Sequence, residues 1–101
     1  MTPVHNEPFV YYTNPHVDVH ESARRHGIDG GTIRHVVRQA IVVADVDEHD
    51  DPPKVLVIGP DGAGNLIEVI LLELADDQLL AIHAMRLRPS FHELLPGADD
   101  A

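Results

Sequence analysis

Three side chains near the end of the chain could perform acid–base chemistry on a phosphate. His83 interrupts an aliphatic run, and Arg86 and Arg88 follow it. An imidazole titrates near neutral pH and can act as a general base. Guanidinium groups bind phosphate through charge-assisted bidentate hydrogen bonds. In the alternative interpretation His83 is a partly buried structural histidine bonded to the backbone, to Glu68 or to Glu73.

The histidines and the absence of cysteine limit the metal chemistry that the sequence predicts. The chain has eight histidines and no cysteine, so a thiolate ligand, a cysteine nucleophile and a disulfide are excluded. There is no HExxH motif, and His16 and His20, four residues apart, lack an evident third ligand. We therefore expect neither a metal nor a cofactor. A small-ligand or metal-binding domain built on the histidines is kept as an alternative.

The charges are unevenly distributed along the chain. A formal net charge of −10 argues against nonspecific binding of nucleic acid by the whole molecule. Acidic residues crowd into positions 45–51, whereas most basic residues fall into two groups. These groups are Arg24, Arg25, Arg34 and Arg38, and then Arg86 and Arg88. If the fold brings the two groups together, a local cationic site exists within an acidic molecule.

Two segments in the front half have helical patterns. Residues 17–26 contain neither Gly nor Pro and precede Gly27, which is placed as a helix C-terminal stop would be. Residues 32–41 follow a turn-forming segment with an N-cap candidate. They carry one apolar stripe at helical spacing, made of Ile33, Val36, Val37, Ala40 and Ile41. We predict two helices here.

The second half of the chain has strand patterns separated by turn signals. The predicted strands are 41–47, 54–59, 66–74 and 78–87, followed by a short helix over 89–95. Counting by two along the last strand puts His83 on one face with Leu79, Ala81, Met85 and Leu87, and Arg86 and Arg88 on the other. The predicted fold class is α+β, with N-terminal helices packed on an antiparallel sheet of about four strands.

The length of 101 residues fits one domain, which we expect to span 16–95. Residues 1–15 contain three prolines and a β-prone run, and we expect a loose tail able to form an edge strand. Residues 96–101 are expected to be a disordered acidic tail. The start of the chain lacks a secretory signal pattern, and no apolar run reaches the roughly 20 residues that cross a bilayer. We expect a cytoplasmic protein without membrane contact.

The order of short motifs resembles BrnT-like proteins, toxins of the RelE superfamily. Their pattern has a "KHGV"-like turn after a helical segment, a basic residue that begins a strand ending in "iG", and a strand resembling "IISAR". The matching segments here are Arg25-His26-Gly27-Ile28, Lys54-Val55-Leu56-Val57-Ile58-Gly59 and Ala81-Ile82-His83-Ala84-Met85-Arg86. The resemblance covers about three quarters of the chain, from His20 to Leu95, and implies a RelE-like arrangement.

The resemblance implies the toxin component of a type II toxin–antitoxin system, a metal-independent endoribonuclease that cleaves messenger RNA. In the last motif His83 stands at the family's serine and Met85 at its arginine, so the arginine role passes to Arg86. On this basis His83 is expected to be the base or acid, with Lys54, Arg86 and Arg88 on the scissile phosphate. Flanking RNA would be held by Arg24, Arg25 and Arg38.

The partners that the resemblance implies are RNA and a cognate antitoxin. An exposed strand edge could also pair with a second copy of the chain. The alternative is a non-catalytic, degenerate toxin-like module for protein interaction. The net charge and the replacement of the family arginine by Met85 both favour that alternative.

Overall fold

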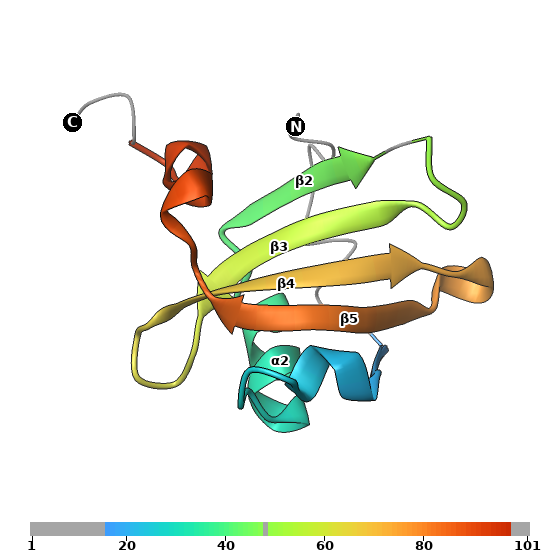
Figure 1. Cartoon of the computed structure of the whole chain (residues 1–101), viewed down its shortest axis with the longest axis horizontal. Coiled ribbons are helices and arrows are strands. Elements are labelled where there is room, and N and C mark those ends of the chain that lie inside the picture. The colour runs from blue at the N-terminus through green and yellow to red at the C-terminus, as the bar shows by residue number, and fades with distance from the viewer. Residues whose placement is uncertain (1–15, 48, 98–101) are drawn as a thin grey trace.

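A five-stranded sheet with a helical layer on one face forms the fold (Figure 1). The computed structural model describes residues 16–47 and 49–97. The elements in chain order are β1 (Val17–Val19), the 3₁₀ helix η1 (Glu21–Arg24), α2 (Gly30–Arg38), β2 (Val42–Asp47), β3 (Lys54–Pro60), β4 (Leu66–Glu73), the 3₁₀ turn η2 (Ala75–Asp77), β5 (Leu79–Arg86) and the 3₁₀ helix η3 (Pro89–Leu94).

The sheet is mixed. Its strand order is β1-β5-β4-β3-β2. The four longer strands form the antiparallel meander that the sequence predicts, and β1 pairs in parallel with β5 at the edge. The α+β class is therefore confirmed, but the sheet has five strands rather than about four.

The predicted first helix, 17–26, is wrong. Val17 and Val19 instead form a parallel edge strand beside Leu79 and Ala81, where β-branched side chains pack well on a pleated surface. This pairing joins residues about sixty positions apart, and a local pattern does not reveal it. Only the four residues of η1 remain helical in that segment, in 3₁₀ form.

The second predicted helix corresponds to α2, which begins and ends earlier than the expected 32–41. Asp29 caps it by accepting a hydrogen bond of 2.7 Å from the Thr32 N–H, and this bond lowers the pKa of Asp29. Buried Ile33, Val36 and Val37 face the sheet. At the other end, a Cβ on Gly59 would lie 2.5 Å from the Val36 carbonyl oxygen, so glycine permits the close approach of α2 to β3.

The two faces of the sheet bury different side chains. The face covered by α2 holds the aliphatic core, which includes Val55, Val57, Ile67, Val69, Leu71, Leu79, Ala81 and Ala84. The opposite face carries Leu56, Ile58 and Glu68, all fully buried. A charged residue thus lies among aliphatic neighbours on the second face.

The predicted tail 1–15 and residues 98–101 lie outside the described residues. Pro96 and Gly97 form a turn after η3. Within the described ranges, no helix has the length and apolar character needed to cross a membrane.

Candidate functional site

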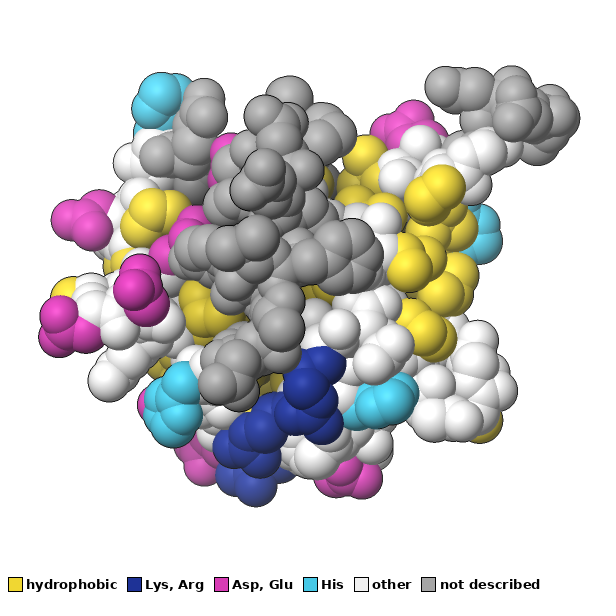
Figure 2. Space-filling view, turned by 180° about the vertical axis from the view of Figure 1, so that it is seen from behind, with side chains coloured by type: hydrophobic (Ala, Val, Ile, Leu, Met, Phe, Trp, Pro, Cys, Tyr) yellow, Lys and Arg dark blue, Asp and Glu magenta, His cyan; other side chains and the backbone are white. Residues whose placement is uncertain are grey.

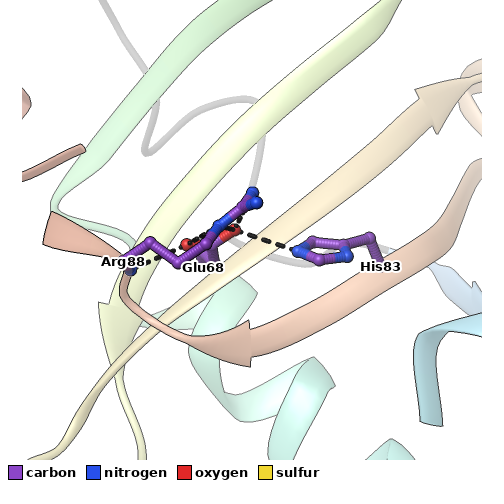
Figure 3. A network of polar contacts seen from close by, with 3 residues as sticks. All are labelled: Glu68, His83 and Arg88. Atoms are coloured by element: carbon purple, nitrogen blue, oxygen red, sulfur yellow. Dashed lines mark hydrogen bonds and ion pairs between the residues drawn. The ribbon is translucent and has the colours of Figure 1, made fainter. Parts of the chain in front are cut away.

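A buried carboxylate on β4 holds an imidazole and a guanidinium together (Figure 3). Glu68 is 0% exposed. It accepts a hydrogen bond of 2.9 Å from the Arg88 backbone N–H, bonds of 3.0 and 3.1 Å from Arg88 Nε, and one of 2.7 Å from Arg88 Nη2. His83 Nε2 lies 2.9 Å from the Oε2 atom of the same carboxylate. Three side chains from β4, β5 and the segment after β5 thus form one cluster.

The surroundings of Glu68 keep it ionised. Burial by itself raises the pKa of a carboxyl group, but the hydrogen bonds from Arg88 and His83 outweigh it and lower the pKa of Glu68 from the ordinary 4.5. The pKa of Arg88 is raised because its side chain is hydrogen-bonded to Glu68. An ionised carboxylate can only accept hydrogen bonds, so Nε2 of His83 carries a proton. In the neutral ring the lone pair is then on Nδ1.

Both partners of Glu68 reach solvent. The His83 side chain is 25% exposed and that of Arg88 is 44% exposed. Arg88 uses Nε and Nη2 on the carboxylate, so N–H donors on the rest of its planar group stay available. The guanidinium carbon also lies 5.2 Å from the centroid of the Phe91 ring on η3, a cation–π distance. The cluster can therefore offer a lone pair and cationic donors to a ligand.

A bulge in β5 puts His83 on the same sheet face as Glu68. Ile70 pairs with His83 but Leu71 pairs with Ala81, so Ile82 is an extra residue in the ladder. Beyond it Ala84 turns to the helix-covered core, whereas His83 and Met85 lie across from Ile70 and Glu68 on the other face. The predicted grouping of His83 and Met85 with Leu79 and Ala81 is therefore wrong, although His83 and Met85 do share a face opposite Arg86. An uninterrupted count by two fails at a bulge.

Arg86 lies on the opposite sheet face from His83, as counting by two predicts. Arg86 pairs with Ile67, which belongs to the helix-covered core, so Arg86 faces away from His83. Arg86 lies near the β3–β4 turn, which contains Asp61. The pKa of Asp61 is lowered by a hydrogen bond from the Asn65 backbone N–H, and the charge of Arg86 lowers it further. The arginine that the structure brings to the imidazole is Arg88, although counting by two places it with Arg86.

Lys54 lies at the other end of the sheet. It begins β3 and forms an ion pair of 3.2 Å with Asp50. On β3 the residue paired with Glu68 is Ile58. Lys54 lies four residues before Ile58, roughly 13 Å away along the strand. The structure does not bring Lys54 to the cluster.

A second imidazole lies against His83. The His26 ring centroid is 5.7 Å from that of His83, and the rings meet edge to face at 73°. β1 ends at Val19, and η1 continues along the edge of β5, where Ser22 Oγ donates a hydrogen bond of 2.7 Å to the carbonyl of bulge residue Ile82. Sequence analysis uses His26 only as part of a motif and does not identify it as a site residue.

The remaining predicted RNA-binding residues lie on the helical side. Arg24 ends η1, Arg25 follows it and Arg38 ends α2, and all three are exposed. Arg34, one turn before Arg38, donates a 2.9 Å hydrogen bond from Nε to the Val17 carbonyl. In the rear view of Figure 2, the basic side chains gather at the bottom, over the helical layer. The acidic side chains lie mainly toward the end of the sheet that carries the β2–β3 and β4–β5 loops. The charge segregation of the sequence is thus kept in space.

No family model, curated protein or solved structure matches the chain. In the described part of the chain, no group of three or more His, Asp or Glu side chains is arranged to hold a metal ion. The residues of the candidate site that sequence analysis underrates are Glu68 and His26. Glu68 does leave a signal, because it is an acid inside the apolar strand LIEVILLE.

Proposed function

We propose that the protein is a BrnT-like toxin of the RelE superfamily that cleaves messenger RNA without a metal ion. The observation that carries the proposal is the Glu68 cluster, in which one buried carboxylate fixes His83 and Arg88 side by side while both stay accessible to solvent. An oriented imidazole beside a guanidinium supplies a proton acceptor and a phosphate-binding group. The order of the sequence motifs supports the same family, and the helix-backed meander supports a RelE-like arrangement.

In the proposed reaction His83 Nδ1 accepts the proton of a ribose 2′-hydroxyl. The 2′ oxygen forms a bond to phosphorus while the bond from phosphorus to the 5′ oxygen breaks, and that oxygen takes up a proton. The products are a 2′,3′-cyclic phosphate and a 5′-hydroxyl end. The free N–H donors of Arg88 stabilise the negative charge on the nonbridging oxygens as phosphorus becomes pentacoordinate.

The flanking RNA would follow the cationic surface beside His26. Arg24 and Arg25 directly precede His26 in the chain, and His26 contacts the His83 ring. Arg38 extends the surface along α2. A cytoplasmic location, a cognate antitoxin and pairing of two copies belong to the same proposal.

A non-catalytic interaction module is the second candidate. It is favoured by the tight pairing of Arg88 with Glu68, which compensates the arginine charge, and by the position of Arg86 on the opposite face. In this case the cluster holds η3 on the sheet and does no chemistry. The acidic end of the sheet would then face a basic protein.

Cleavage of end-labelled messenger RNA by purified protein distinguishes the two candidates. The endoribonuclease proposal expects fragments with 2′,3′-cyclic phosphate ends, slowed growth on expression, and loss of both effects in His83→Ala. A matched control is His16→Ala, at an exposed histidine directly before β1. Intact RNA with the wild-type protein, or equal cleavage by wild type and His83→Ala, would refute the proposal.

A further inference from the structure

We infer that His26 is the general acid of the proposed reaction and forms a catalytic pair with His83. The inference rests on the proposed function and adds a residue to it. The carrying observation is the contact of the two rings, whose centroids are 5.7 Å apart. His26 is exposed, so a substrate can reach it.

The position of His26 is fixed by the edge of β5. The His20 backbone N–H donates a 2.9 Å bond to the Ala81 carbonyl, and Ser22 Oγ bonds the Ile82 carbonyl. After η1 the chain reverses at Gly27, whose φ of +83° is in the left-handed region and whose N–H donates to the Arg24 carbonyl. His26 therefore lies in a hydrogen-bonded turn attached to the same bulge that orients His83.

The chemistry needs a second proton-transfer group. In an in-line displacement the attacking and leaving oxygens lie on opposite sides of phosphorus, so one ring nitrogen cannot serve both. The Nε2–H of His83 is engaged by Glu68, which leaves that ring only Nδ1 for proton transfer. A second imidazole in contact with the first can reach the other side of a bound phosphate.

The proton balance closes with the two histidines. His83 takes the proton from the 2′-hydroxyl as the new P–O bond forms, and protonated His26 gives its proton to the 5′ oxygen as the old P–O bond breaks. His83 ends protonated and His26 ends neutral. Exchange with water restores both, and no other reactant is needed.

A substrate with an activated leaving group distinguishes a general acid from a general base, because its leaving group needs no proton. A ribonucleoside 3′-(4-nitrophenyl phosphate) releases 4-nitrophenolate, which leaves without protonation. His26→Ala should lower RNA cleavage about 100-fold, the usual contribution of a general acid, and leave release of 4-nitrophenolate within about threefold of wild type. His83→Ala should lower both, because the attacking hydroxyl still needs a base.

Controls keep the result interpretable. His26→Gln, which keeps much of the side-chain size, should behave as His26→Ala does, and His16→Ala should cleave both substrates as wild type does. Urea unfolding verifies that each variant is folded. Normal RNA cleavage by His26→Ala, or equal loss on both substrates, would overturn the role of His26 alone. Absence of wild-type cleavage of either substrate would overturn the proposed function with it.

Discussion

The two faces of the sheet differ in how they use buried positions. On the face under α2, aliphatic side chains such as Val57, Val69 and Leu71 pack into a continuous core. On the opposite face a fully buried position is taken by Glu68, which is surrounded by donors from His83 and Arg88. The first face buries an apolar cluster, whereas the second buries a charge beside fully buried Leu56 and Ile58.

Burying the charge of Glu68 has a cost in folding free energy. A buried carboxylate is unfavourable unless it is paired and hydrogen-bonded, and an apolar side chain of similar size often stabilises a protein as well or better. Glu68 is satisfied by the arginine fork, by a backbone N–H and by an imidazole. What the pairing secures is a fixed arrangement of His83 and Arg88, which an apolar residue would not provide.

The largest expected effect is on the helix-covered face. Leu71→Ala removes a side chain that is 0% exposed, and the lost burial with the cavity left behind should lower the free energy of unfolding by about 2–5 kcal/mol. Urea denaturation measures the change. A loss below about 1 kcal/mol would mean that this face is loosely packed.

Glu68→Gln should have a smaller effect on stability. Charge-assisted bonds are replaced by weaker ones, but Arg88 is 44% exposed and can be rehydrated, so we expect a loss of about 2 kcal/mol rather than the larger cost of leaving a buried partner unpaired. The matched control is Glu93→Gln on exposed η3, which should change stability by less than about 0.5 kcal/mol. Equal effects of the two substitutions would show that the buried pairing contributes nothing to the stability of the fold.

The pH dependence of stability should reveal the same carboxylate. The pKa of Glu68 is lower in the folded protein than its ordinary value of 4.5, so the unfolded chain binds the proton more strongly. The contribution of Glu68 is therefore complete above the ordinary pKa and is lost as pH falls toward the folded one. Urea titrations between pH 7 and pH 3 should show the difference between wild type and Glu68→Gln shrinking in the acidic range. A stability difference that does not change with pH would contradict the lowered pKa of Glu68.

The smallest effect concerns the edge that orients His83. Ser22→Ala removes the 2.7 Å bond to the Ile82 carbonyl and should lower stability by about 1 kcal/mol. Amide exchange should increase in η1 and around the bulge, while β3 is unchanged. Unchanged exchange near Ile82 would mean that η1 does not stabilise the bulge.

Local patterns account for the meander but not for the sheet edge. The strands β2 to β5 match the predicted ranges closely because β-branched runs and Gly or Pro turns mark both their existence and their ends. The segment 17–26 reads as a helix in sequence because it contains neither Gly nor Pro. Its strand depends on parallel pairing with β5, a tertiary contact that overrides local propensity.

The candidate site could be predicted only in part, for a similar reason. The structural interpretation of His83 expects a bond to Glu68 or Glu73, and the bond to Glu68 is present. Two features of the site have no sequence signal. One is the extra residue Ile82, which puts His83 on the face of Glu68. The other is the course of the chain after β5 ends at Arg86, which brings Arg88 to Glu68. The contact of His26 with His83 joins distant segments and has no sequence signal of its own.

The most direct measurement compares RNA cleavage by Arg88→Ala and Arg86→Ala. The two arginines are two residues apart, but Arg88 bonds Glu68 beside His83 and Arg86 faces the other side of the sheet. Loss of Arg88 should slow cleavage on the order of 100-fold, the usual effect of removing a donor to a developing oxyanion, and loss of Arg86 should change it by less than about threefold. Equal losses, or a larger loss with Arg86, would contradict the account.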